Sequence, residues 1–195
     1  FQDYQCVRIF RFEKNRGLTA SRNHLLEKAK GQYISILDAD DVLLPNKIMD
    51  HASVLEKDKN AAVVWGRAIV RNLKTQALEV VPDSSYQHQW DLIETYQAVH
   101  SATSWRRSAL LDVGGYDPRR TLTEDADMFL KVGDRYSQVF LPTLVAVKYR
   151  NPEGAFRLPE RSIERKQLER ELMKDTLRRR YQKSSLAISP EQKPI

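Results

Sequence analysis

Segments with the periodicity of strands and of helices alternate through the first 70 residues of this chain. Three are short, apolar and rich in β-branched or aromatic residues, and the two between them have helical spacing. In order they are Val7–Phe12, Thr19–Lys30, Tyr33–Leu37, Pro45–Leu55 and Ala62–Val70. This β–α–β–α–β order predicts an α/β fold in which helices flank a mostly parallel, Rossmann-like sheet.

Local signals predict where the first two helices begin, end and face the core. Thr19 is placed to cap the first helix, with Gly31 in its C-terminal turn. Pro45 suits the first turn of the second helix. The apolar residues of the second helix share one face, which we expect to be buried: Ile48, Met49, Ala52 and Leu55.

The second half of the chain is less regular. We expect a short strand at Ser101–Trp105 and one or two strands within 138–149. Helices are expected at Trp90–Gln97, at Arg107–Val113 before the stop signal Gly114-Gly115, and from a Thr123 cap to about Tyr136.

Length and periodicity indicate one domain followed by one long helix. With 195 residues, 41% of them hydrophobic, the chain is long enough to bury a sizeable core. We expect a catalytic domain at residues 1–158, a basic helix at 159–183 and a disordered tail at 184–195. Four residues of the helix are expected to face inward: Ile163, Leu168, Leu172 and Tyr181.

Composition suggests a soluble chain in a reducing compartment. No apolar run approaches the roughly 20 residues that span a bilayer. We see no basic-then-apolar leader. Cys6 is the single cysteine, so the chain has no internal disulfide. We therefore expect a cytoplasmic location, with the inner face of a membrane as a second option.

The positive charge is concentrated near the C-terminus. The net charge is +6, and residues 157–183 hold ten Lys or Arg against five Asp or Glu, a surplus of five. No stacking aromatics or reading motif accompany these charges, so we expect no nucleic-acid partner. The charges indicate a solvated helix or, as the alternative, one that makes peripheral contact with an anionic membrane surface or partner.

Three carboxylates follow the third periodic segment. Asp38, Asp40 and Asp41 come directly after the apolar residues Tyr33–Leu37, at the strand end where open α/β sheets bind ligands. Crowded carboxylates raise one another's pKa, and a divalent cation such as Mg²⁺ or Mn²⁺ would relieve the repulsion. The plainer alternative is that Asp38 or Asp41 only caps the following turn.

A second carboxylate group lies at a predicted helix start, Thr123-Glu124-Asp125. Such residues are ordinary at helix N-termini, where they suit the helix dipole. Asp125, however, shares the spacing of the apolar residues Met128, Phe129 and Val132, and Asp127 does not. We therefore expect Asp125 to face the domain body, where its pKa would be raised as a general base requires.

Other candidate residues give weaker signals. Arg22 on the first helix points to a ligand at the sheet edge or to solvent. Gly114-Gly115 is a helix stop or a loop that lets backbone approach a sugar. Trp105 is a core residue or a platform for a sugar ring. The four histidines lack the mutual spacing of zinc ligands and are expected to be structural: His24, His51, His88 and His100.

Four segments, in order, resemble those of glycosyltransferase family 2, whose members have the GT-A fold and invert the anomeric carbon. They are Asn15–Leu18 followed by Ala20–Asn23, Gly31–Asp41 with its Asp-x-Asp motif, Arg107-Ser108 followed by Val113–Asp117, and Thr123–Asp125. The resemblance covers about 120 residues. It also implies that the front third of such a domain is missing from this chain.

The resemblance assigns roles to individual residues. Asp40 and Asp38 would bind a divalent metal, Mn²⁺ or Mg²⁺, and the nucleotide-sugar. Arg22 would hold the nucleotide, and Gly114 with Gly115 would lie beside the donor sugar. Asp125 would be the catalytic base. The partners implied are a nucleotide-sugar donor, UDP-sugar first, and a glycan or lipid-linked acceptor in cell-surface or secreted glycan synthesis.

Two rival hypotheses compete with a transferase. Asp38-Ala39-Asp40-Asp41 also fits the first motif of haloacid dehalogenase-type phosphohydrolases, although that motif normally lies on a domain's first strand. A third reading is an inactive or glycan-binding remnant of a glycosyltransferase. The intact carboxylates at Asp40 and Asp125 favour the enzyme.

Overall fold

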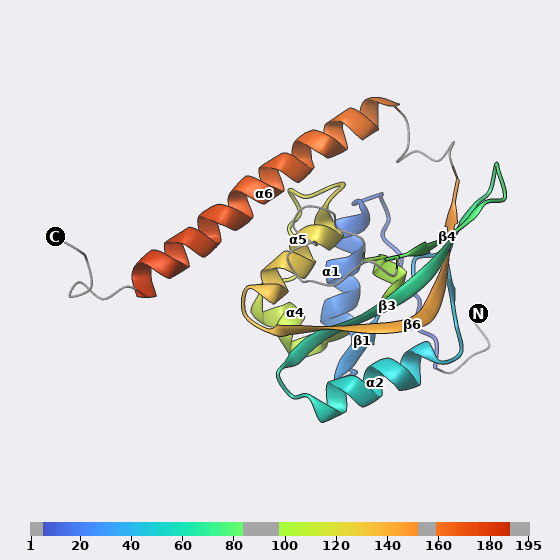
Figure 1. Cartoon of the computed structure of the whole chain (residues 1–195), viewed down its shortest axis with the longest axis horizontal. Helices are drawn as coiled ribbons and strands as arrows, with labels where there is room; N and C mark the ends of the chain where they lie inside the picture. The colour runs from blue at the N-terminus through green and yellow to red at the C-terminus, as the bar shows by residue number, and fades with distance from the viewer. Residues whose placement is uncertain (1–5, 84–97, 152–158, 188–195) are drawn as a thin grey trace.

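The computed structural model describes residues 6–83, 98–151 and 159–187, and it places a six-stranded sheet at the centre of the chain (Figure 1). The strands are β1 (Tyr33–Ser35), β2 (Val42–Leu43), β3 (Ala61–Asn72), β4 (Leu78–Val81), β5 (Thr103–Arg106) and β6 (Ser137–Arg150). Their order is β1-β5-β3-β6-β2, with β4 paired to β3. The α/β prediction is confirmed.

The sheet is mixed rather than mostly parallel. Only β3 and β6 run parallel among the described strands, and the other four pairings are antiparallel. The helical segments predicted a parallel crossover after each strand, but β1 pairs with the later strand β5 in the antiparallel sense. This part of the sequence prediction is corrected.

The long β3–β6 pair forms the middle of the sheet. It runs from Ala61 opposite Ser137 to Asn72 opposite Arg150, with register shifts around Gly66. A Cβ at Gly66 would lie 2.7 Å from the Val145 Cγ2 atom and 2.9 Å from the Thr143 carbonyl oxygen. Glycine therefore allows the two backbones to approach at the irregularity.

Within the described residues five helices accompany the sheet: α1 (Leu18–Lys28), α2 (Lys47–Lys57), α4 (Arg107–Asp112), α5 (Glu124–Gly133) and α6 (Pro159–Ala187), with a 3-10 turn η1 (His100–Ala102). The main core lies where α5 meets the sheet. There the Phe129 ring makes edge-to-face contacts with Trp65 and Trp105, at centroid distances of 5.8 and 5.6 Å. Trp105 is fully buried, so its reading as a sugar platform is wrong.

The buried face of α2 is not the predicted one. Lys47, His51 and Leu55 are fully buried, whereas Ile48 is 51% exposed and Met49 75% exposed. Residues four apart share a helix face, so the face with a lysine and a histidine packs inward. It does so because their polar atoms meet hydrogen-bond acceptors there, as shown for the site below.

Two expectations for the first 30 residues also fail. Val7–Phe12 forms no strand; these residues are mostly exposed and pair with no described strand, and Phe10 and Phe12 pack on the His24 ring. Thr19 does not cap α1, which begins at Leu18 after Gly17, and its hydroxyl donates to the Arg120 carbonyl oxygen at 3.4 Å. The helix ends at Lys28, before Gly31.

The remaining elements agree with the sequence more closely. β3, β5, α4, α5 and β6 lie where strands or helices were predicted, within a few residues. The predicted helix at 90–97 lies outside the described residues, as do residues 188–195 of the expected tail. The helix α6 continues to Ala187, so residues 184–187 are helical rather than part of a tail.

The long helix α6 packs on α5 through a short inward face. Leu172 is buried against Ala126 and Leu130 of α5. Thr176, one turn further along, is fully buried too. The predicted inward residues Ile163 and Tyr181 are 71% and 76% exposed. None of the helices described here has the length and apolar character needed to cross a bilayer.

Candidate active site

The aspartate loop after β1 carries three carboxylates, Asp38, Asp40 and Asp41, and each lies in a different environment. Asp41 is buried, accepts a hydrogen bond from the Ser101 hydroxyl at 2.6 Å and from the Tyr149 N–H at 3.3 Å, and burial raises its pKa. The Asp38 side chain is partly buried, and Asp40 is exposed. Asp41 therefore fixes the loop, and the other two carboxylates remain for a ligand.

Ser101 and Lys47 hold this loop from inside the domain. The Ser101 hydroxyl also accepts the Asp38 N–H at 3.0 Å. The buried Lys47 ammonium donates to the Ile36 carbonyl oxygen at 2.8 Å and to the Ser101 carbonyl oxygen at 2.7 Å. Burial lowers the pKa of Lys47 to about 7. Sequence reasoning missed Lys47, because a lysine between helical apolar residues is normally solvated.

Arg22 joins the two carboxylate motifs, which are distant in sequence. Its guanidinium donates from Nη2 to Asp38 Oδ1 at 2.8 Å and from Nη1 to Glu124 Oε1 at 2.7 Å. The Arg22 side chain is 11% exposed and lies over the Tyr116 ring, 5.7 Å from its centroid. The structure thus brings Arg22, Asp38 and the start of α5 together, as the resemblance requires.

The two carboxylates at the start of α5 differ in their contacts. Glu124 is buried and is engaged by Arg22. Asp125 is partly buried, and its carboxylate accepts only the neighbouring Ala126 N–H, at 2.8 Å, among the described residues. Burial raises the pKa of both groups, and the Asp125 carboxylate raises that of Glu124 further. Asp125 is therefore the freer carboxylate and the better candidate base.

Two details of the α5 prediction are corrected. Asp127 is 2% exposed and thus more buried than Asp125, because almost all of α5 is enclosed and Lys131 pairs with Asp127 at 3.1 Å. Thr123 precedes the helix as predicted, but its hydroxyl is buried and makes no hydrogen bond within the described residues, so it does not cap α5 through its side chain.

The loop after α4 is held against α1. Asn23 accepts the Tyr116 N–H and donates to the Tyr116 carbonyl oxygen, both at 2.8 Å. Gly114 and Gly115 have φ values of 82° and 71°, which favour glycine. A Cβ at Gly115 would lie 2.7 Å from Asn23 Oδ1, whereas one at Gly114 would meet nothing within 4 Å. Only Gly114 has open space beside it.

The histidines have structural roles where they are described. The ring of His51 hydrogen-bonds Ser104 Oγ at 2.9 Å, and that of His100 hydrogen-bonds the Tyr116 hydroxyl at 3.0 Å. Both rings are buried, and burial lowers the pKa of each. His24 contacts two phenylalanines, and His88 lies outside the described residues.

The carboxylates near β1 fit a metal that is shared with a substrate. No group of three or more His, Cys, Asp or Glu side chains in the described part of the chain is arranged to hold an ion alone. Asp40 is exposed and makes no hydrogen bond or ion pair there. Mg²⁺ and Mn²⁺ commonly take one or two carboxylates together with phosphate oxygens, which matches Asp40 with Asp38.

Comparison with known proteins decides the family. The model of glycosyl transferase family 2 matches residues 1–114, which include α1, the aspartate loop and α4. This chain belongs to glycosyl transferase family 2. The alternative of a haloacid dehalogenase-type phosphohydrolase is therefore wrong. Glu124 and Asp125 lie beyond the matched range.

Curated relatives carry the same description. An uncharacterised glycosyltransferase of Rickettsia typhi is 28% identical over 146 residues, 71% of this chain and 46% of the relative. The putative glycosyltransferase EpsE of Bacillus subtilis is 28% identical over 128 residues, 64% of this chain and 45% of EpsE. The chain thus spans less than half the length of these relatives.

Solved structures show the GT-A fold. S. aureus TarS 1-349 in complex with UDP superposes with a TM-score of 0.56 at 18% identity, covering 73% of this chain and 43% of that chain. A mannosyltransferase of Pyrobaculum calidifontis in complex with GDP-Man and Mn²⁺ has a TM-score of 0.50 at 16% identity, covering 70% of this chain and 37% of that protein. The predicted GT-A fold of this family 2 chain is confirmed.

Proposed function

We propose that this family 2 chain forms the carboxylate-bearing part of an inverting transferase that moves a hexosyl or N-acetylhexosaminyl group from a nucleotide-sugar to an acceptor hydroxyl. The observation that carries the proposal is the pairing of the Arg22 guanidinium with both Asp38 and Glu124, which brings the aspartate loop next to the start of α5. Fold and family agree with it. UDP-sugar is the donor we favour, as TarS has been crystallised with UDP and with UDP-GlcNAc.

Asp125 would take the proton from the acceptor hydroxyl as that oxygen attacks the anomeric carbon. A base must be free to receive a proton, and Glu124 is already neutralised by Arg22. Attack from the side opposite the departing nucleotide is a single displacement and inverts the configuration. We expect a glycan or lipid-linked acceptor, in cell-surface or secreted glycan synthesis.

Asp40 and Asp38 would hold a divalent cation together with the donor diphosphate. When bound, such an ion stabilises the negative charge that builds on the leaving nucleoside diphosphate. Asp38 stays oriented by Arg22 and by its N–H bond to Ser101. Arg22 would act on the nucleotide through Asp38, because its own donors face the two carboxylates. Gly114, with open space beside it, is the loop residue best placed for a sugar.

The first test is a donor panel. The chain, and the product of the whole reading frame that contains it, would be incubated with UDP- and GDP-sugars, Mn²⁺ and simple acceptors, and product configuration read by NMR. We expect an inverted linkage. Retained configuration would overturn the mechanism. If neither protein hydrolyses or transfers any donor sugar, the result would favour the inactive or glycan-binding remnant.

A second test isolates the metal. Asp40→Ala should abolish transfer and weaken Mn²⁺-dependent binding of UDP in calorimetry, while UDP binding without Mn²⁺ should change little. Asp50→Ala, which alters an acidic residue in the first turn of α2 bonded to Asn46, is the control. Unchanged Mn²⁺-dependent binding by Asp40→Ala would remove Asp40 from the metal site.

A further inference from the structure

The outward face of α6 carries an unusual set of side chains. Helical residues three and four apart share a face, and the face opposite Leu172 and Thr176 contains both basic and apolar groups. We call these residues the α6 outer stripe: Ile163, Lys166, Gln167, Arg170, Lys174, Leu177, Arg178 and Tyr181. The stripe has four cationic side chains, and the exposed Glu171 borders it.

The positive charge of the stripe is largely unneutralised. Lys166, Arg170 and Lys174 are exposed and make no ion pair or hydrogen bond with any described residue. Arg178 lies 3.6 Å from Asp175, at the edge of ion-pair distance. By contrast, the inward side of α6 is tied to the domain by paired charges: Arg120 with Asp175, and Arg179 and Arg180 with Asp134.

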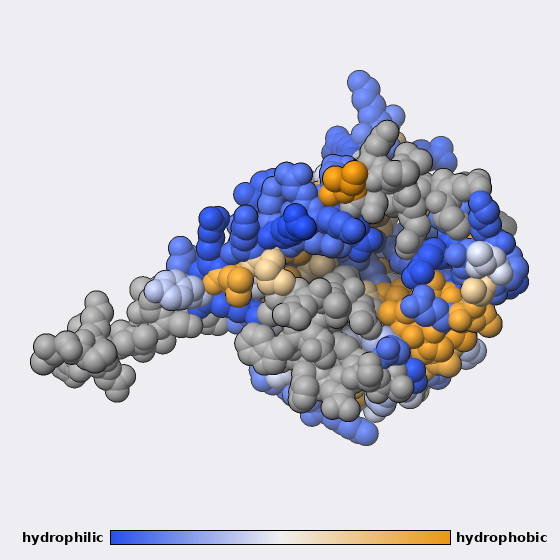
Figure 2. Space-filling view, turned by 45° about the horizontal axis from the view of Figure 1, so that its top comes forward, coloured by the Kyte–Doolittle hydropathy of each residue, from blue (hydrophilic) through white to orange (hydrophobic). Residues whose placement is uncertain are grey.

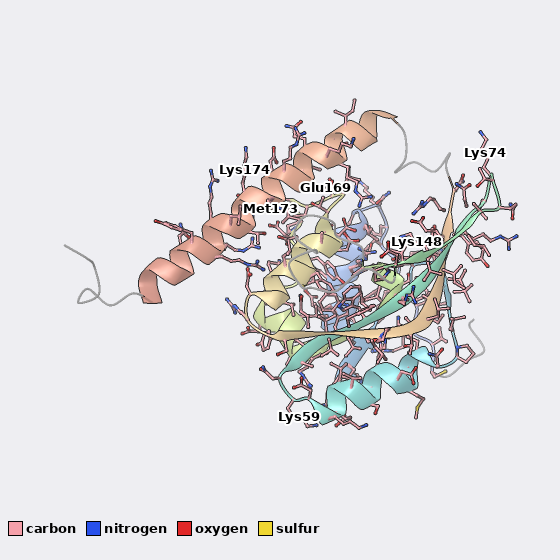
Figure 3. All side chains as sticks on the ribbon, viewed as in Figure 1. Lys59, Lys74, Lys148, Glu169, Met173 and Lys174 are labelled. Carbon is pink, nitrogen blue, oxygen red and sulfur yellow. The ribbon has the colours of Figure 1, made fainter. Side chains whose placement is uncertain are left out.

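Large apolar side chains interrupt the cations on the same side. Ile163 is 71% exposed, Leu177 54% and Tyr181 76%. Figure 2 shows the hydrophilic surface along α6 broken by a few hydrophobic side chains, and Figure 3 shows Lys174 on the side of the helix away from the sheet. A leucine, an isoleucine and a tyrosine thus share the basic side of α6.

We propose that the α6 outer stripe binds an anionic phospholipid surface, with the helix lying in the plane of the membrane. The four cations match lipid phosphates and anionic headgroups, and the apolar side chains would enter the interface between them. Tyrosine suits that depth because its ring is apolar and its hydroxyl remains hydrated. Vesicle binding needs no sugar donor. The proposal can therefore be tested independently of the transfer reaction.

The stripe and the candidate base lie on two helices that pack on each other. Ala126, the residue after Asp125 on α5, packs against Leu172 of α6. Inward contacts at Leu172 then keep α6 fixed on α5. A chain resting on the outward face of α6 would therefore hold the start of α5 on the opposite side of that helix, in a fixed position relative to the membrane.

The test is co-sedimentation of the 195-residue chain with vesicles. We expect binding to vesicles of 70% phosphatidylcholine and 30% phosphatidylglycerol, little binding to pure phosphatidylcholine, and release as salt rises from 0.05 to 0.5 M. Lys166→Gln, Arg170→Gln and Lys174→Gln together should weaken partitioning about 100-fold, at about fivefold for each charge. Glutamine preserves helix propensity, and circular dichroism checks the fold.

A matched variant removes the same charge elsewhere. Lys57→Gln, Lys59→Gln and Lys74→Gln together alter exposed lysines on or near α2 and in the β3–β4 turn, away from α6 (Figure 3). They should weaken binding no more than about threefold. Leu177→Ser with Tyr181→Ser should weaken binding while its salt dependence remains.

Four results would overturn the proposal. One is equal binding to both vesicle types, and another is equal loss in the α6 and control variants. A third is an oligonucleotide that displaces the chain from vesicles and binds it more tightly through the same lysines. The last is a dimer that the α6 triple variant converts to monomer, which would make the stripe an interface between two copies.

Discussion

Asp125 and Glu124 are adjacent carboxylates, but their neighbours leave them with different capacities to accept a proton. Arg22 compensates Glu124, and Asp125 has only its local backbone contact. Asp125→Asn keeps size and polarity but cannot accept the proton, so transfer should fall by roughly 10² to 10⁴ fold. Donor binding should change little, as measured by calorimetry alongside initial rates.

Asp127→Asn is the control for that substitution. It alters a buried aspartate on the same helix that pairs with Lys131, and it should affect stability more than the rate of the folded protein.

Because burial raises the pKa of Asp125, the acid limb of the wild-type rate profile should lie above the ordinary aspartate value of 3.8. Near-normal transfer by Asp125→Asn would move the base elsewhere.

Lys47 should give the protein a distinctive pH dependence of stability. Its pKa is about 7 when folded and 10.5 ordinarily, so between these values the unfolded chain binds more protons. The free energy of unfolding should therefore rise with pH across that window, by roughly a few kcal/mol relative to Lys47→Met. Urea titrations of both proteins at several pH values measure the difference; parallel curves would contradict it.

At the scale of elements, the sequence predicted the positions of helices and strands better than the pairing of the strands and the buried faces of the helices. Periodicity located β3, α5 and β6, because each buries a long apolar set. It could not show that β1 pairs antiparallel with β5, because strand direction depends on the whole chain path. The face of α2 was missed because hydrogen-bond acceptors at Ile36 and Ser101 stabilise an inward Lys47.

For the candidate site too, the sequence indicated local motifs but not the contacts between distant segments. Asp38, Asp40, Arg22 and Asp125 were proposed from the sequence, since their motifs are local. The buried residues that orient them, above all Ser101 and Lys47, were not found, since each acts through contacts with a distant segment. No local pattern marks a serine that joins two aspartates.

The Gly114-Gly115 loop gives a paired test at this scale. Gly114→Ala introduces only the strain of a positive φ, about 1 kcal/mol. Gly115→Ala has the same strain and also places Cβ 2.7 Å from Asn23 Oδ1, which two hydrogen bonds to Tyr116 hold in place. Chemical denaturation should show the larger loss for Gly115→Ala. Equal losses would mean that Asn23 yields freely.

At the scale of the whole molecule, α6 is an attached helix whose contact is narrow. Leu172→Asp would bury an unpaired charge against Ala126 and Leu130, so α6 should detach and its many Lys and Arg sites should become trypsin-sensitive. Leu177→Asp, on the exposed side, should be cleaved no faster than the wild type. Mass spectrometry of the fragments checks both.

The intact domain should remain after α6 is cut from the Leu172→Asp variant. The main core of Trp65, Trp105 and Phe129 lies on the other side of α5 and does not include α6. Global unfolding of Leu172→Asp, rather than cleavage confined to residues 159–187, would show that α6 is part of the cooperative unit.

Arg22 has one more consequence, for anyone who builds chimeras from this family. Its two ion pairs join α1 to the aspartate loop and to α5, and the Tyr149 N–H bond to Asp41 adds the end of β6. Donor and acceptor preferences therefore cannot be exchanged by grafting α5 or the aspartate loop alone. A swapped segment must run from α1 through β6 as one block, with crossovers before Leu18 and after Arg150.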